Sequence, residues 1–120
     1  MSRMAEGIIG GVVGGALVKG LMKFPIPTSN KQLISSTSVP ASGSATLLSS
    51  TAFKFAIILF HGDGDSDITV TIAGATNRSI AGNQSGIETI ANETISITAS
   101  NSNTTTAKNT PTIEILSLQW

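Results

Sequence analysis

The chain has 120 residues, only 12% of them charged, and its seven basic residues balance seven acidic ones. Balanced charge gives no electrostatic reason to expect nucleic acid as a partner, and the absence of cysteine excludes disulfides, thiolate chemistry and cysteine-ligated metal. Ser and Thr supply 31 residues, so hydroxyl groups carry much of the polarity. This composition suits a protein that packs among copies of itself or carries sugar, because isolated soluble domains normally depend on charge for solubility.

The first 24 residues hold half of the twelve glycines, and their spacing is regular. Five glycines fall on two adjacent stripes of one side of a helix: Gly7, Gly10, Gly11, Gly14 and Gly15. The opposite side carries apolar residues: Ile8, Ile9, Val12, Val13 and Ala16. We predict a hydrophobic glycine-zipper helix over residues 5–24, within an N-terminal unit 1–24, because side-chain-free edges allow close helix contact.

Pro25 and Pro27 end this helix, and residues 25–30 are predicted to form a Pro-x-Pro hinge. The uncharged run from Gly7 to Val18 is short for a bilayer span. Three interpretations therefore stay open: insertion into a membrane, packing in a protein bundle, or removal as a leader. Glycine in a helix interior costs about 1 kcal/mol relative to alanine, so each interpretation requires a neighbour that shelters the helix.

From residue 31 onward the hydrophobic pattern has a period of two, which is typical of strands. Seven strands are predicted: Leu33–Ser38, Ala45–Leu48, Phe53–Phe60, Ile68–Ala73, Ile87–Ile90, Glu93–Ala99 and Thr112–Leu118. Short strands separated by frequent turn signals predict a mainly β fold. We expect a small antiparallel β-sandwich, of jelly-roll or Ig-like type, over residues 31–120.

The strongest of these strands is Phe53–Phe60, which is apolar on both faces apart from Lys54. We expect it to lie centrally in a sheet that is covered on both sides. The segments Pro40–Gly43 and His61–Asp67 are predicted turns, and Asn101–Thr110 is a polar loop.

Asp63, Asp65 and Asp67 form the pattern Asp-Gly-Asp-Ser-Asp, which resembles the opening of a calcium loop. Ile68 occupies the position where such a loop needs glycine, and the next acid is Glu88. The three carboxylates are therefore a weak metal candidate, and a solvated hairpin tip is the competing interpretation.

His61 is the only histidine, and Ser66 is the nearest hydroxyl that could act as a nucleophile. Nothing in the sequence supplies an oxyanion hole for them. We expect no enzymatic activity, no cofactor, no small-molecule substrate and no nucleic-acid partner. Trp120, the only tryptophan, is expected to cap the core or to lie at a subunit contact.

Four asparagines stand in N-x-S/T sequons: Asn77, Asn83, Asn92 and Asn103. They are possible glycosylation sites on an outer surface. Asn and Ser/Thr are also ordinary turn residues, which is the competing interpretation. Asn92 lies next to a predicted strand and is the poorest acceptor of the four.

A helix that needs shelter, followed by an all-β head, indicates a structural protein. The sequence favours a virion component, such as a minor capsid, vertex or spike-base protein, whose helix enters a membrane or inner layer. Its partners would be copies of itself and other structural subunits. The alternative is a subunit of a glycosylated cell-surface filament, similar in plan to archaeal pilins, which pair a hydrophobic N-terminal helix with an outer glycosylated sandwich. A calcium-dependent adhesin head is a third possibility.

Overall fold

The computed structural model describes residues 28–119, and this part of the chain is built from β-strands without a helix. The strands are β1 (Thr28–Ile34), β2 (Ser38–Val39), β3 (Ser44–His61), β4 (Ile68–Ala73), β5 (Arg78–Ala81), β6 (Ser85–Asn101), β7 (Lys108–Asn109) and β8 (Ile113–Gln119). Every strand pair is antiparallel. The prediction of a mainly β, antiparallel fold is confirmed.

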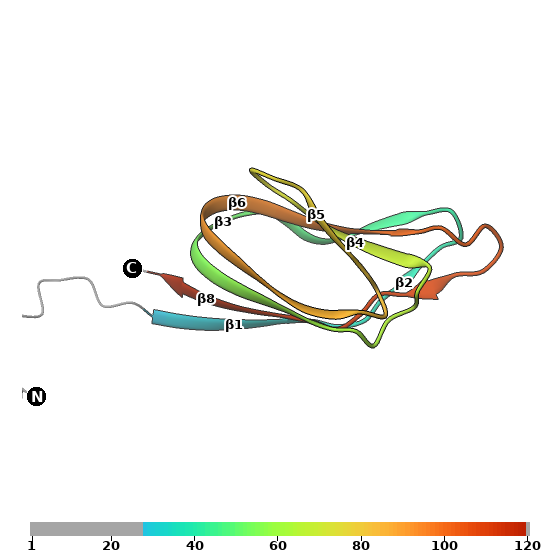
Figure 1. Cartoon of the computed structure of the whole chain (residues 1–120), viewed down its shortest axis with the longest axis horizontal. Helices are drawn as coiled ribbons and strands as arrows, with labels where there is room; N and C mark the ends of the chain where they lie inside the picture. Colours follow the sequence, from blue (N-terminus) through green and yellow to red (C-terminus); the bar gives the residue numbers. More distant parts are fainter. Residues whose placement is uncertain (1–27, 120) are drawn as a thin grey trace, which may run out of the picture.

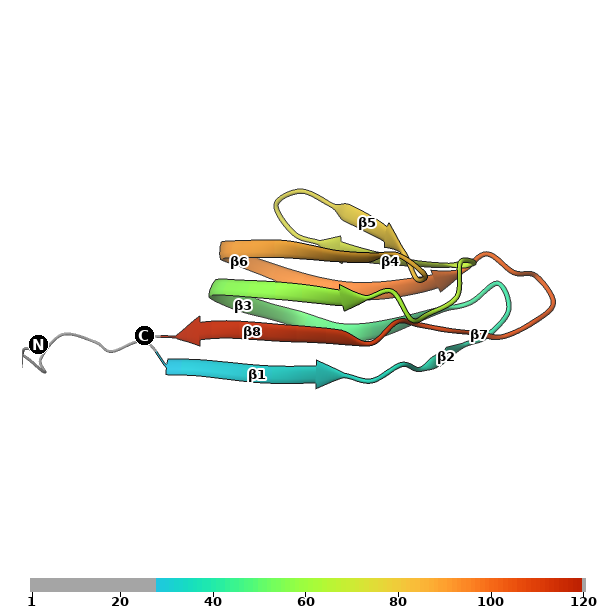
Figure 2. The ribbon, with the colours of Figure 1, turned by 60° about the horizontal axis from the view of Figure 1, so that its bottom comes forward.

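Six strands form one sheet in the order β1-β8-β3-β6-β4-β5, and β2 pairs with β7 separately. Strands β3 and β6, with 18 and 17 residues, pair along most of their length. The second half of β3 also pairs with β8, whereas the second half of β6 pairs with β4. The long pair curves round at one end, so its two halves lie in different layers of the molecule (Figures 1 and 2).

The first layer therefore consists of β1, β8, the second half of β3 and the first half of β6. The second layer consists of the first half of β3, the second half of β6, β4 and β5. Alternate side chains from both layers meet in a single hydrophobic core that includes Ile58, Ile97 and Ile115, each at most 1% exposed. Each layer consequently has one inner face on the core and one outer face.

The change of layer is visible in the burial pattern of β6. Ile90 is buried on the first-layer side and Ile95 on the second-layer side, so the buried positions shift from even to odd numbers. Asn92 lies between them with a φ of 50°, in the left-handed region that most side chains avoid. In β3, the register shifts twice between Thr46 and Thr51, and such bulges bend a strand and increase its twist.

The predicted strands differ from the observed ones mainly in their ends. Ile68–Ala73 is confirmed as β4. The predicted Ala45–Leu48 and Phe53–Phe60 are one continuous strand, β3, and the predicted Ile87–Ile90 and Glu93–Ala99 are likewise one strand, β6. The polar residues between them suggested breaks, but bulges and a left-handed Asn92 keep the ladder intact.

The sequence pattern missed β5, and it placed the first strand too late. The predicted Leu33–Ser38 overlaps β1 only at Leu33 and Ile34, and residues 35–37 belong to no strand. Strand β1 begins at Thr28, inside the expected hinge 25–30, and the short β2 follows at Ser38. The turn Pro40–Gly43 is present, closed by the Gly43 N–H donating to the Pro40 carbonyl at 2.9 Å. The predicted Thr112–Leu118 corresponds to β8.

The glycine-zipper helix predicted over residues 5–24 and the terminal Trp120 lie outside the described residues. Within residues 28–119, no helix has the length and apolar character needed to cross a membrane.

Candidate interaction surface

The outer face of the first layer carries a row of large apolar side chains on four neighbouring strands. Cross-strand partners share one face of a sheet, and the register places these residues together: Leu33, Phe55, Ile57, Leu59, Ile87, Leu116 and Leu118. We call this set the apolar face. Leu33, Ile87 and Leu116 are 57%, 65% and 45% exposed. The described part of the chain places no further strand over it (Figures 1 and 2).

The apolar face follows directly from the sequence of β3. Ile57 opposes Leu116 of β8, and Phe55 opposes Leu118, so apolar side chains lie next to one another across the strands. Strand β3 is central, as predicted, between β8 and β6. We expected both sides of this strand to be covered. Within the described residues only the inner side is covered, and there Ala56, Ile58 and Phe60 are buried.

Charged side chains lie in and beside one end of the apolar face: Glu114 stands between Leu33 and Leu59 in the register, and Lys31 opposes Leu116. The Glu114 carboxylate lies 3.3 Å from His61 Nε2 and 3.9 Å from Lys31 Nζ. Glu114 opposes Leu33 and Leu59 on the neighbouring strands, so it stands on the same face. His61 therefore belongs to a rim of polar contacts around Glu114. Ser66, in the following turn, is exposed and has no part in that rim.

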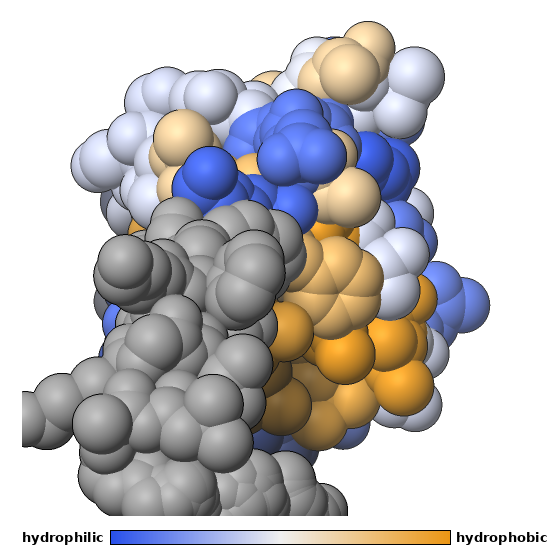
Figure 3. Space-filling view, turned by 90° about the vertical axis from the view of Figure 1, so that its left-hand side faces the viewer, coloured by the Kyte–Doolittle hydropathy of each residue, from blue (hydrophilic) through white to orange (hydrophobic). Residues whose placement is uncertain are grey.

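The outer face of the second layer has the opposite character. It carries eight hydroxyl side chains at positions aligned by the register: Ser44, Thr46, Thr69, Thr71, Ser79, Ser96, Thr98 and Ser100. We call this set the hydroxyl face. Seen from the end where β3 and β6 curve round, hydrophobic surface gathers in the lower right of the molecule, below a mainly pale and blue upper part (Figure 3).

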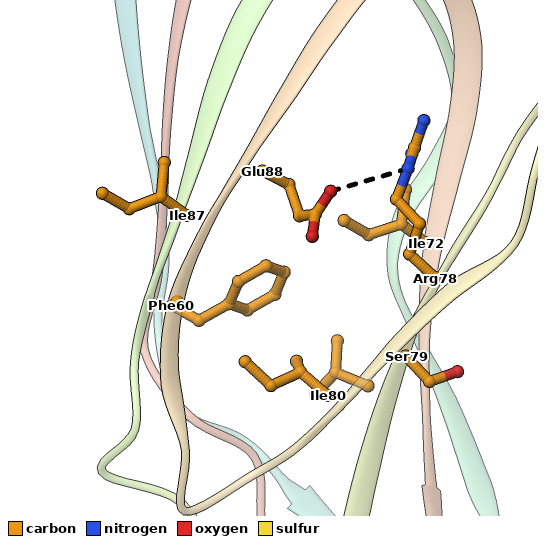
Figure 4. Close-up of a pocket in the computed structure, with 9 residues that line it drawn as sticks. Phe60, Ile72, Arg78, Ser79, Ile80, Ile87 and Glu88 are labelled. Atoms are coloured by element: carbon orange, nitrogen blue, oxygen red, sulfur yellow. Dashed lines mark ion pairs between the residues drawn. The ribbon is translucent and has the colours of Figure 1, made fainter.

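A hollow of about 80 Å³ opens between the two layers beside β5. Its apolar lining includes the Phe60 ring, Ile72 and Ile80 (Figure 4). Arg78 lines its polar side, with Nε 3.6 Å from Glu88 and Nη2 3.0 Å from Glu93. Arg78 Nη1 is buried without a hydrogen-bond partner in the structure.

Glu93 joins β6 to the turn after β4. It accepts a hydrogen bond of 2.7 Å from the Ala75 backbone N–H and pairs with Arg78. These contacts, the Ala75 N–H first, lower the pKa of Glu93 below its ordinary value. The carboxylate is thus held ionised as a structural group at the edge of the hollow.

The three aspartates of the predicted calcium loop point to different partners. The Asp63 carboxylate accepts hydrogen bonds from the Thr112 N–H and hydroxyl at 2.7 and 2.8 Å, and mainly the N–H bond lowers its pKa. Asp65 accepts from the Asp67 N–H and lies 3.6 Å from Lys108 Nζ.

Asp67 completes this arrangement by accepting from the side-chain amide of Asn103 at 3.1 Å. Among residues 28–119, no group of three His, Cys, Asp or Glu side chains is placed to hold a metal ion. The carboxylates of the turn instead tie it to the loop before β8 and to the loop after β6.

The four sequon asparagines lie in three settings. Asn77 and Asn83 are exposed in the turns on either side of β5, and Asn92 is exposed at the bend of β6. Asn103 is half-buried, and its carbonyl oxygen accepts from the backbone N–H groups of Thr105 and Thr106. Because its amide nitrogen also donates to Asp67, a glycan at Asn103 would replace a loop contact.

Asn101 is a structural residue that the sequence pattern did not identify. It is 4% exposed, and its amide nitrogen donates to the carbonyls of Val39, Pro40 and Thr106 at 3.0–3.3 Å. Its side-chain oxygen accepts from the Asn103 N–H. A buried amide with its partners fixed in this way closes the end of the fold where β2 and β7 pair.

No family model matches the chain, and no curated protein matches it.

Proposed function

We propose that the chain is a non-enzymatic structural protein of a virion, a minor capsid, vertex or spike-base component. The observation that carries this proposal is the contrast between the apolar face and the hydroxyl face. Contiguous apolar surface on a soluble monomer is an aggregation hazard, whereas in an assembly it serves as a contact surface. The virion and its neighbouring subunits would supply that assembly, with the segment 5–24 held in a membrane or inner layer.

The use of polar side chains supports a structural role. Asp63 joins the turn after β3 to Thr112, and Asn101 joins three carbonyls. His61 contacts Glu114 at the rim of the apolar face. Each of these groups stabilises the fold, so the proposal includes no cofactor, no metal, no small-molecule substrate and no nucleic acid. Copies of the chain and other structural subunits are its partners.

We also propose that the two facing layers represent a small sandwich of the jelly-roll or Ig-like type. Two antiparallel layers around one core, with outer faces of different character, support this classification.

The second candidate is a subunit of a glycosylated cell-surface filament. Exposed Asn77 and Asn83, together with the hydroxyl face, favour it because they would form a sugar-bearing exterior. A filament subunit polymerises with a uniform helical rise in electron micrographs, and its intact mass exceeds that of the bare sequence when glycans are attached.

The experiment that tests the virion proposal follows the protein through particle purification. We expect the chain to co-purify with particles and to resist extraction by salt. Leu116→Asp, on the apolar face, should abolish incorporation, whereas the matched change Thr69→Asp, on the hydroxyl face, should leave it intact. Recovery of the unaltered chain as a soluble monomer from cytosol, or equal incorporation of both variants, would contradict the proposal.

A further inference from the structure

The apolar face has the dimensions of a helix-binding surface. Four strands spaced about 4.8 Å apart, over some seven residues at about 3.4 Å each, give roughly 400 Å². A stable dimer of standard size buries about 800 Å² on each partner. As a flat footprint the apolar face is about half that size, which favours an occupant smaller than a second copy.

The segment that precedes β1 has the right length and position to be that occupant. Residues 5–24, outside the described part of the chain, are predicted to form a helix, which would be about 30 Å long and 10 Å wide. Only residues 25–27 separate it from β1, the edge strand of the same layer. Helices and strands that pack together are commonly joined by two to six residues.

Only one side of the first layer is available to this segment. The inner side is filled by the core, where Ile58 and Ile115 are at most 1% exposed. A helix about 10 Å wide covers two strands, and the two middle strands, β8 and β3, carry the most continuous apolar row, including Ile57 and Leu118.

We propose that residues 5–24 pack as a helix over the apolar face of their own chain. Ile8, Ile9, Val12 and Val13 then contact the sheet, and the stripes of Gly7, Gly10, Gly11, Gly14 and Gly15 point outward. The outward stripes rest on the proposed function, because they would be the edge at which the helix of a neighbouring subunit packs. This arrangement selects an inner protein layer, rather than a membrane, as the surroundings of the segment.

The absence of cysteine makes the cover directly measurable. Leu116→Cys places one thiol on the apolar face, and Thr69→Cys places one on the hydroxyl face of an otherwise identical full-length chain. Both parent positions are exposed in the described structure. We expect a maleimide to label Cys at position 116 at least about tenfold more slowly, because labelling must wait for local opening of the helix.

Two further variants locate the protection. Val12→Asp combined with Val13→Asp should bring labelling at position 116 up to the rate at position 69, since the helix can no longer dock. Gly11→Leu should leave protection unchanged and weaken only assembly, with Ser100→Ala as the neutral control. The tenfold difference should persist when the protein is diluted.

Three outcomes would overturn the inference. Equal labelling rates at both positions show an open face. Protection that disappears on dilution shows that a second copy covers it, and protection that requires phosphatidylcholine vesicles shows that lipid does. A chain that protects position 116 but never enters particles retains this inference and loses the proposed function, so the two can fail separately.

Discussion

The two outer faces of this protein belong to the same hydrogen-bonded sheet, but one carries mainly apolar side chains and the other mainly hydroxyl side chains. On the first layer, Ile57 lies between Leu116 and Thr89. On the second layer, Thr98 lies between Thr46 and Thr71. Ile57 and Thr98 are both β-branched and both suit a strand. Strand propensity therefore does not explain why one face is apolar and the other carries hydroxyl groups.

We infer that the two faces differ in what covers them beyond residues 28–119. Threonine fits a sheet surface that meets water, because its hydroxyl stays solvated. Leucine and isoleucine on an outer face lose about 25 cal/mol of stabilisation for each Å² left in water. In the proposed assembly, hydrophobic alternation would report burial against a neighbour as well as burial in one folded domain.

The largest effect is expected from a charge in the middle of the apolar face. Ile57→Asp should lower the free energy of unfolding by about 3 kcal/mol and abolish assembly, because a half-buried carboxylate there has no partner. Thr71→Asp, its counterpart on the hydroxyl face, should change stability by less than about 0.5 kcal/mol. Urea unfolding followed by circular dichroism measures both, and similar losses for the pair would remove the distinction between the faces.

A smaller effect is expected at the bend that creates two layers from one strand pair. Asn92 has a φ of 50°, which a β-branched residue adopts only with strain. Asn92→Val should therefore lower stability by about 1–2 kcal/mol. Asn92→Gly, which accepts this conformation, is the control and should stay close to the unaltered protein. Equal melting temperatures for the two variants would contradict the role assigned to this residue.

Converting the hydroxyl face toward the apolar one should affect association more than stability. In the double variant Thr71→Val and Thr98→Val, two cross-strand neighbours lose their hydroxyls while strand propensity is kept. We expect the free energy of unfolding to change by less than about 1 kcal/mol, with a clear rise in light scattering from self-association. An unchanged scattering profile would mean that hydroxyl groups do not keep this face solvated.

The smallest effect concerns acid stability at the end of the apolar layer. Contacts with Thr112, at the entry to β8, hold the pKa of Asp63 below its ordinary value of 3.8. Their stabilisation is complete above that value and is lost as the pH falls through the lowered pKa of the folded state. Asp63→Asn should reduce the melting temperature near neutral pH and lessen its further decline in acid. Parallel melting curves from about pH 2 to pH 6 test this, and identical profiles would exclude it.

The strand predictions were most accurate where apolar and polar residues alternate without interruption. Ile68–Ala73 alternates without interruption, and it is β4 from end to end. The division of β3 and β6 into shorter pieces was wrong because bulges and a left-handed asparagine carry the ladder through polar residues. Strand β5 was missed because its four residues are too few to show a period.

The candidate surface was only half predictable. The strand Phe53–Phe60 shows apolar residues on both sides, which indicated two covers, but a pattern cannot say whether the second cover comes from the same domain. The pairing of Asp63 with Thr112 spans 49 residues, and Asn101 contacts Val39 across 62. Such contacts depend on the closed topology, so spacing along the chain gives no sign of them.

The pairing of β1 with β8 has a consequence for synthesis. Thr28 aligns with Gln119, so β1 leaves the ribosome well before β8 and must wait for it before their ladder can form. Contacts between distant parts of a chain close slowly, and unpaired strands are prone to aggregate meanwhile. Until β8 has been synthesised, the nascent polypeptide carries an unpaired strand edge, and holding chaperones protect such edges from aggregation.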